Sequence, residues 1–199
     1  SLNSGTSYYE TGTEQNISLS GLITANDETV FSNAIIDISD GSTINLPSIA
    51  GNYQIQDDGI VVDVDYTAQV EVGGNGTPNT IVSAKKYIRF IYASYFGENT
   101  TGIIPTAAEI KLGTKRIVTT NSYFINNPET TGADYGWFAV PKNQTGKIYT
   151  TWFVVVGNDG AIGSGQFIKS PTTVVVDEID YDVYIYGYAS ELTNNLKLS

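Results

Sequence analysis

Hydrophobic and polar residues alternate along several stretches of this chain. The clearest stretch is residues 61–72 (VVDVDYTAQVEV), where apolar and polar residues take turns from position 62 onward. The apolar side consists of Val62, Val64, Tyr66, Ala68, Val70 and Val72. A period of two is typical of a β-strand with one buried and one solvated face. A turn-forming loop and a long β-branched and aromatic run (residues 80–96) follow, so the pattern predicts a β-hairpin.

Shorter strand candidates precede this hairpin. They are QNISLSGLI (residues 15–23), AIIDIS (residues 34–39) and NYQIQ (residues 52–56), and they are separated by TANDE, DGSTINLPS and DDG. Short strands with turn signals at such spacing indicate an antiparallel β-sandwich. Residues 1–88 have about the length of an immunoglobulin-like domain, although the disulfide and the buried Trp of that fold are absent. Tyr66 is a candidate for the tyrosine corner of such a domain.

The remainder of the chain, residues 89–199, carries one helix signal among further strands. The helix signal is PTAAEIKLG, with Pro105 in the first turn and Gly113 at the stop. The strand candidates are KRIVTTNSYFI, YGWFAVPK, KIYTTWFVVV, QFIKS, TTVVV and DYDVYIYGYA. A final hairpin should pair TTVVV with YDVYIY across a tight turn in VDEID. We therefore expect an all-β chain: an Ig-like antiparallel sandwich over residues 1–88, then a second β-sandwich-like domain with one short helix over residues 89–199.

The composition removes several classes of chemistry. The 199 residues contain no cysteine, no histidine and no methionine. Without cysteine there are no disulfides, thiol nucleophiles or Cys-type zinc sites. Without histidine, Ser-His-Asp and Cys-His catalysis are excluded within this chain. The missing methionine leads us to expect a processed product or part of a longer protein.

The charge is unevenly distributed along the chain. The formal net charge is −11, and residues 1–84 hold 11 acidic residues and no Lys or Arg. Residues 85–199 hold 10 acidic and 10 basic residues, whose charges cancel. An acidic surface repels phosphate backbones, so we expect no nucleic-acid partner. No apolar run approaches the roughly 18 residues of a membrane span, so we expect none.

Paired carboxylates are the main catalytic route that remains, apart from Lys or Tyr chemistry. Glycoside hydrolysis needs two carboxyl groups roughly 5 to 9 Å apart. The candidates are Asp57 with Asp58, Asp63 with Asp65, and Asp177 with Glu178 and Asp180. The first pair precedes a glycine as in a turn, the second lies on the wet face of a strand, and the third group lies in a hairpin. Because a structural role explains each group better, we expect no enzyme.

Calcium is the one cofactor to consider, because the acidic loops could supply oxygen ligands. Calcium takes six to eight oxygen ligands, and QDDGIVVDVD and GNDG supply such groups. Neither stretch matches the spacing of the EF-hand loop. The sequence therefore supports no cofactor.

Aromatic residues near the end of the chain form a row on one side of a predicted strand. In DEIDYDVYIYGYAS (residues 177–190), Tyr184, Tyr186 and Tyr188 share a side with Asp182, opposite Val183 and its aliphatic neighbours. Because Asp182 belongs near water, we expect the aliphatic side to be core. We expect the tyrosine side to be at least partly exposed or buried by a partner, which suits a ring with a polar hydroxyl.

Both tryptophans, Trp137 and Trp152, lie in residues 134–156. One interpretation places these aromatics in the core of the second domain. The other interpretation is an exposed aromatic platform for sugar rings. The candidate binding residues are therefore Tyr184, Tyr186, Tyr188 and Trp137.

The order of these features resembles that of bacteriophage virion proteins of the tail-fibre, baseplate and head-fibre kind. The motifs that carry the resemblance are YIRFIYASYFG, PTAAEIKLG, KRIVTTNSYFI, GWFAVPK and VVVDEIDYDVYIYGY. In such proteins an Ig-like domain leads into a second β-domain, and the hairpin turn often carries Asn-Gly where this chain has Asp177 and Glu178. The resemblance covers most of the chain, best from about residue 60 onward. It implies no enzymatic residues.

The resemblance implies a structural or host-attachment module of a virion appendage, located in the virion. Its partners would be other virion proteins and a host surface glycan or protein, and it would be a homo-oligomer, a trimer by analogy. The alternative is a bacterial adhesin or carbohydrate-binding module located outside the cell or on its surface, which uses the same Ig-like layout with exposed aromatics. An enzyme with paired carboxylates ranks last.

Overall fold

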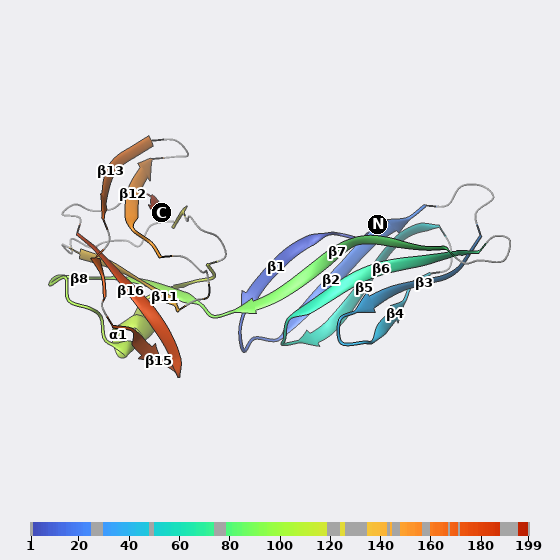
Figure 1. Ribbon diagram of the computed structural model, residues 1–199, viewed down its shortest axis with the longest axis horizontal. Coiled ribbons are helices and arrows are strands. Elements are labelled where there is room, and N and C mark those ends of the chain that lie inside the picture. Colours follow the sequence, from blue (N-terminus) through green and yellow to red (C-terminus); the bar gives the residue numbers. More distant parts are fainter. Residues whose placement is uncertain are drawn as a thin grey trace. The chain divides into compact units, whose positions relative to one another are not determined.

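The chain divides into two compact units, which we describe separately. The computed structural model covers residues 1–199 and describes residues 2–24, 30–47, 50–73, 79–118, 124–125, 135–142, 144, 148–156, 160–166, 168–170, 172–187 and 195–198. The first unit is Ser1–Ile91 and the second is Tyr92–Ser199. The boundary thus follows residue 91, close to the expected boundary after residue 88. Both units are built mainly from strands (Figure 1).

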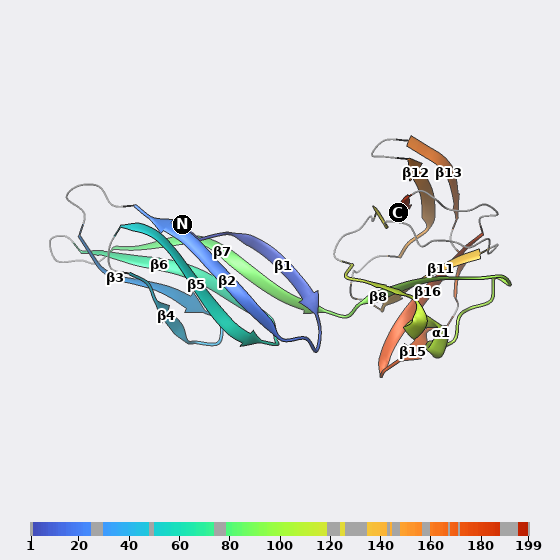
Figure 2. The same cartoon turned by 180° about the vertical axis from the view of Figure 1, so that it is seen from behind.

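The first unit contains a five-stranded sheet and a two-stranded sheet. The strands are β1 (Gly5–Glu10), β2 (Gln15–Ile23), β3 (Val30–Ile38), β4 (Thr43–Asn45), β5 (Gly51–Ile60), β6 (Val64–Gly73) and β7 (Asn79–Ile91). The larger sheet has the order β1-β7-β6-β3-β4, and β2 pairs with β5. Seen from behind, β2 and β5 lie in front of the larger sheet (Figure 2).

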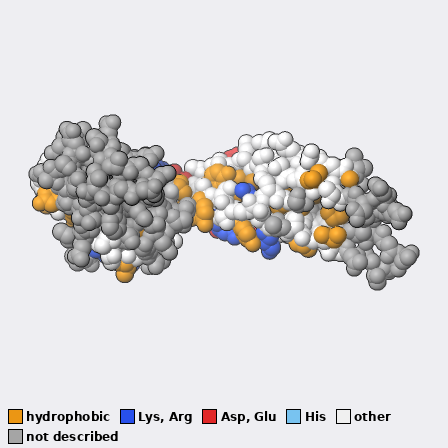
Figure 3. All heavy atoms as spheres, turned by 90° about the horizontal axis from the view of Figure 1, so that it is seen from above, with side chains coloured by type: hydrophobic (Ala, Val, Ile, Leu, Met, Phe, Trp, Pro, Cys, Tyr) orange, Lys and Arg blue, Asp and Glu red, His pale blue; other side chains and the backbone are white. Residues whose placement is uncertain are grey.

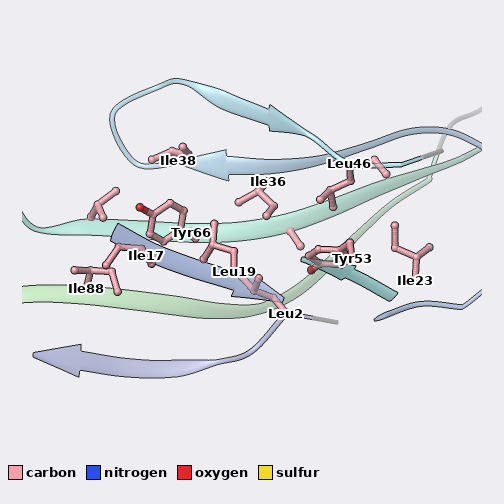
Figure 4. Packing of buried hydrophobic residues seen from close by; sticks show 13 residues of the cluster. Leu2, Ile17, Leu19, Ile23, Ile36, Ile38, Leu46, Tyr53, Tyr66 and Ile88 are labelled. Carbon is pink, nitrogen blue, oxygen red and sulfur yellow. The ribbon is translucent and has the colours of Figure 1, made fainter. Parts of the chain in front are cut away.

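The core of the first unit is supplied by both sheets. Its largest fully buried side chains include Leu19 from β2, Ile36 from β3, Tyr66 from β6 and Ile88 from β7. Figure 4 shows these side chains gathered between β2 and the larger sheet. The alternation of residues 61–72 is confirmed from Val64 to Ala68, because Val64, Tyr66 and Ala68 are buried. Val62 precedes the strand and is 66% exposed, contrary to the pattern.

Three expectations about this unit are wrong in detail. The DGSTINLPS stretch, expected as a connection, contains strand β4. The pairing is not wholly antiparallel, because β1 runs parallel to β7. The DDG stretch is not a turn: Asp57, Asp58 and Gly59 lie inside β5. The β2–β5 register shifts between Gln15 and Ile17, so that β5 carries an extra residue opposite Asn16. Gly59 has φ +77°, the left-handed conformation that glycine adopts without strain, and its N–H donates to Asn16 Oδ1 at 3.3 Å.

The second unit is built around a larger sheet of order β14-β16-β11-β8-β9, on which β15 also pairs with β16. Another sheet has the order β10-β17-β12-β13. The strands are β8 (Ser94–Asn99), β9 (Thr114–Arg116), β10 (Phe124–Ile125), β11 (Tyr135–Pro141), β12 (Thr151–Val156), β13 (Gly160–Gln166), β14 (Ile168–Lys169), β15 (Val174–Val176), β16 (Ile179–Gly187) and β17 (Asn195–Leu198). In the described part of the chain, no helix has the length and hydrophobicity that crossing a membrane would require.

The predicted helix is confirmed as α1 (Ala107–Leu112). Thr106 is its N-cap: Thr106 Oγ1 accepts from the Glu109 N–H at 3.3 Å, and Glu109 Oε2 accepts from the Thr106 N–H at 2.7 Å. This reciprocal capping box fixes the helix start. Pro105 therefore precedes the helix rather than opening its first turn, whereas Gly113 ends the helix as expected.

The tight turn between β15 and β16 is confirmed. Val176 pairs with Ile179, so Asp177 and Glu178 form a two-residue connection. Their φ angles are +47° and +69°, as a type I′ turn requires. The hairpin is shorter than expected, since β15 pairs only with the first three residues of β16.

Candidate binding surface

The predicted tyrosine surface on β16 is wrong for the residues that the structure describes. Tyr184 and Tyr186 are both 0% exposed within a single chain. Tyr188 lies outside the described residues. The aliphatic side is confirmed as core for Val183 and Ile185, which are 0% and 4% exposed. Strand β16 is thus buried on both faces rather than on one.

An aromatic cluster explains the burial of the tyrosine side. Phe138 of β11 is paired with Phe96 on one neighbouring strand and with Tyr184 on the other. The Phe96 and Phe138 rings stack with centroids 4.5 Å apart, and Tyr149 meets Tyr184 edge-on at 5.4 Å. The Asp182 side chain is partly buried, with 16% of its surface exposed, and it accepts from Lys169 Nζ at 2.9 Å.

Burial raises the pKa of the Tyr184 and Tyr186 hydroxyls above the ordinary value of a tyrosine. For Tyr184 the Asp182 carboxylate adds to that rise, whereas a hydrogen bond with the backbone of Tyr149 opposes it. These hydroxyls stay protonated at neutral pH and are enclosed by protein. They form part of a core and present nothing to a ligand.

Trp137 also belongs to the core. It is 3% exposed and packs in a cluster with Ile110 of α1 and Ile185 of β16. Its indole lies against Gly97, the residue paired with it on β8. The core interpretation is therefore right for Trp137, and a sugar platform at this position is wrong. The side chain of Trp152 lies outside the described residues.

Each group of acidic side chains that was a candidate for catalysis has a member engaged in a structural contact. Asp57 Oδ2 accepts from the buried Tyr66 hydroxyl at 2.7 Å. Asp65 Oδ1 lies 2.7 Å from Arg89 Nη1, and Asp177 Oδ1 lies 2.7 Å from Lys111 Nζ. Among the described residues, no three Asp or Glu side chains gather in a group that could hold a metal ion.

A different aromatic surface is accessible on the first unit. Tyr8 of β1 is paired with Arg89 of β7, and Tyr87 of β7 is paired with Asp65 of β6. Paired residues project from the same face of a sheet, and this face is opposite to the one that buries Ile88. Tyr8 is 41% exposed. We refer to Tyr8, Tyr87 and Arg89 as the tyrosine–arginine face. In the space-filling view, basic and hydrophobic side chains lie side by side on this unit (Figure 3).

Arg89 is the centre of this face and is held in place from several sides. Its guanidinium lies 5.1 Å from the centroid of the Tyr87 ring and contacts Asp65. Arg89 Nη1 also donates to the Ile88 carbonyl at 2.7 Å and to the Val64 carbonyl at 3.3 Å. A guanidinium stacked on a ring and bound to a carboxylate fixes the ring's position. The face therefore offers pre-positioned aromatic surface beside the Arg89–Asp65 ion pair.

The sequence contained a signal for this face that the prediction overlooked. In KKYIRFI, Lys85, Tyr87 and Arg89 alternate with Lys86, Ile88 and Phe90. This period of two could have placed Tyr87 and Arg89 on a wet face. The neighbouring position of Tyr8 could not be found in this way, because β1 pairs with a strand about eighty residues away in the chain.

The outer face of β2 and β5 is polar rather than aromatic. A shallow hollow of about 550 Å³ lies there, and its polar lining comes from Asn3, Ser20, Asn52 and Gln54. Amide and hydroxyl groups of this kind can bond a sugar or a peptide backbone. The hollow contains no charged side chain among its lining residues.

Comparisons with models of protein families, with curated proteins and with solved structures each found no match.

Proposed function

We propose that this chain is a non-enzymatic structural or host-attachment module of a bacteriophage virion appendage. The observation that carries the proposal is the tyrosine–arginine face, an accessible aromatic surface on a unit in which the candidate carboxylates Asp57 and Asp65 serve structural contacts. Aromatic and arginine side chains are enriched where proteins contact partners. The assignment to a virion rests on the resemblance of the motifs from YIRFIYASYFG to VVVDEIDYDVYIYGY.

An Ig-like sandwich for the first unit belongs to this proposal. The neighbours β3-β6-β7 match the C-F-G strands of an Ig domain, and the pair β2-β5 matches its B and E strands. Tyr66 lies near the start of β6, where a tyrosine corner would place it. Its hydroxyl binds the side chain of Asp57 rather than a backbone group. The second unit would be a sandwich-like domain, which the burial of both faces of β16 supports.

The proposed partners are other virion proteins and a glycan or protein of the host surface, and the chain would act as a homo-oligomer in the virion. The attachment role can be tested with labelled protein and a panel of bacterial cells and their isolated surface polysaccharides. We expect Tyr8→Ala to weaken binding at least roughly tenfold, as loss of a central aromatic contact does. Thr43→Ala, on the exposed strand β4, is the matched control and should bind like the parent protein.

The location is tested separately with antibodies raised against the purified chain. Labelling of purified bacteriophage particles would support the virion assignment. Labelling of the bacterial envelope in the absence of particles would overturn it. Labelled particles combined with no binding to any cell or polysaccharide would leave a structural role and remove the attachment role.

The second candidate is a bacterial adhesin or carbohydrate-binding module. The exposed Tyr8 ring and the amide-lined hollow of Asn52 and Gln54 favour it, because sugars stack on aromatic rings and bond to amides. Envelope labelling together with a Tyr8-dependent affinity for a polysaccharide would favour this function.

A further inference from the structure

Strand β5 lies at the edge of its sheet. Among the described residues it pairs only with β2, and its ten residues make it the longest strand at a sheet edge. A long sheet edge presents a row of backbone N–H and C=O groups that can pair with another strand. Three-residue strands occupy other edges, at β4 and β9. The edge of β5 is therefore the strongest template for strand addition in the part of the chain described.

The contacts of Asn3 show which backbone groups of β5 face outward. The Asn3 N–H donates to the Ser20 carbonyl at 2.8 Å, and Asn3 Nδ2 donates to the Ser18 carbonyl at 3.3 Å. Ser18 and Ser20 thus direct their backbone groups away from β5. They are paired with Gln56 and Gln54. In an antiparallel ladder both members of such a pair point their N–H and C=O groups away from each other.

Gln54 and Gln56 therefore present backbone donors and acceptors at the outer edge, and Asn52 does so by the same alternation. Their amide side chains lie on the solvent face, since all three residues are exposed while Tyr53 between them is buried. The regular part of the strand runs from Gly51 to Asp57, where the bulge begins. The centre of these seven residues is Gln54.

We propose that a second copy of this chain adds to this edge, antiparallel, with a two-fold axis through Gln54. Gln54 of each copy would then lie opposite the other, and Asn52 would lie opposite Gln56. On the core side, Tyr53 would lie opposite Ile55. Amide thus meets amide and apolar meets apolar over residues 52–56, which is the pairing that stabilises a sheet. The two β2–β5 pairs become one four-stranded sheet.

The pattern of the strand, amides at 52, 54 and 56 and apolar residues at 53 and 55, is symmetric about Gln54, so the edge is complementary to a second copy of itself. Residues 1–84 carry 11 acidic residues and no Lys or Arg, so two copies repel each other in most orientations. In this register Asp57 lies opposite Gly51, and no acid of the strand faces another acid. The bulge at Asp58 and Gly59 ends the ladder on both sides, so the contact closes as a dimer and does not grow.

This pairing follows from backbone geometry and does not depend on a virion location. It also differs from the trimer that the resemblance implied. Failure of the proposed function and failure of the pairing are therefore distinguishable, because the first is read from binding and labelling and the second from the mass and register of the purified chain.

The register is tested with single cysteines, because the chain contains none. In Gln54→Cys the two cysteines lie in a hydrogen-bonded pair with Cα atoms about 5.5 Å apart, within reach of a disulfide. In the matched variant Gln56→Cys they are four residues apart along the ladder, roughly 13 Å. We expect mild oxidation to cross-link Gln54→Cys and to leave Gln56→Cys uncross-linked. Equal cross-linking of both variants, or of neither, would overturn the proposal.

The mass of the purified full chain is measured by sedimentation over a range of concentrations. We expect a dimer whose dissociation constant rises roughly fivefold in Gln54→Glu, which places two carboxylates opposite each other. Gln54→Pro removes the outward N–H and should raise it by roughly a hundredfold. The control Ser18→Glu adds the same charge on the same face, one strand away from the edge. A monomeric parent chain, a trimer, or a dimer whose dissociation constant is the same in both Gln54 variants as in the parent would overturn the proposal. Circular dichroism confirms that each variant is folded.

Discussion

At the scale of single residues, two glycines decide where the aromatic side chains of the second unit lie. Gly97 is paired with Trp137, and Gly136 is paired with Tyr186. A Cβ atom at either glycine would overlap the ring of its partner. Each glycine thus leaves room for a large ring to fold over the neighbouring strand, so Trp137 and Tyr186 become buried instead of projecting into solvent.

Gly136→Ala should therefore destabilise the second unit. The added methyl group meets the fully buried Tyr186 ring, and overpacking of this kind costs about 2 kcal/mol. The free energy of unfolding is measured in urea by tryptophan fluorescence. Combining Gly136→Ala with Tyr186→Leu should show a favourable coupling, because the smaller side chain leaves room for the methyl group. Strictly additive effects would contradict the overlap.

Tyr66→Phe should destabilise the first unit. Tyr66 is 0% exposed and its hydroxyl donates to Asp57 Oδ2 at 2.7 Å, so the change removes a partly buried hydrogen bond to a charged group. We expect a loss of about 2 kcal/mol in the free energy of unfolding, followed by far-ultraviolet circular dichroism. Tyr8→Phe is the control, since that side chain is exposed, and it should change the stability by less than about 0.5 kcal/mol. Equal effects of the two changes would contradict a structural role for this bond.

At the scale of elements, local pattern predicted the helix and strands such as β2, but it missed β1 and β17 and did not show what packs against each strand. Residues 15–23 form β2 as expected, and the helix lies where Ala107 to Gly113 indicated. The error at β16 has a physical cause. A period-two pattern indicates which residues share a face of the strand, but not what lies against that face. Tyr184 is covered by Phe138 and Tyr149, which come from distant parts of the chain.

The β15–β16 turn offers a test at this scale. Glu178 has φ +69°, a conformation that costs a residue with a Cβ about 1 kcal/mol and costs glycine nothing. Glu178→Gly should therefore raise the free energy of unfolding by roughly 0.5 to 1 kcal/mol, and it leaves the Lys111–Asp177 ion pair in place. Glu178→Val is the matched variant with the opposite expected effect, a lower free energy of unfolding, because a β-branched residue tolerates this conformation worst. A stabilised Val variant would show that the turn is not type I′ in solution.

At the scale of the whole molecule, the sequence indicated two β-rich parts and the position of their boundary, but not their long-range pairings. The parallel contact of Tyr8 with Arg89 joins residues from opposite ends of the first unit. No short-range pattern specifies that register. The accessible aromatic face combines this contact, which no local pattern shows, with the period-two signal of KKYIRFI, which the prediction overlooked when it placed the candidate site on β16 of the second unit.

Tyrosines buried in both units should make the chain sensitive to alkali. Burial, reinforced by the hydrogen bond to Asp57, raises the pKa of Tyr66 above its ordinary value of 10.0, and burial raises the pKa of Tyr186 in the same direction. Above pH 10 the unfolded chain loses these protons while the folded chain retains them. The folded state is therefore fully favoured below pH 10 and loses stability as pH rises from there towards the raised pKa values.

Each such tyrosine should lower the free energy of unfolding by about 1.4 kcal/mol per pH unit in this range. The measurement is urea unfolding at steps from pH 8 to pH 11, with tryptophan fluorescence reporting the second unit, which contains Trp137 and Trp152. The informative comparison is between variants. Tyr186→Phe should flatten the decline seen by fluorescence, and Tyr8→Phe should leave it unchanged. If both variants decline as steeply as the parent chain, ionisation of Tyr186 is not linked to unfolding, and the enclosed aromatic cluster would have to be open to solvent.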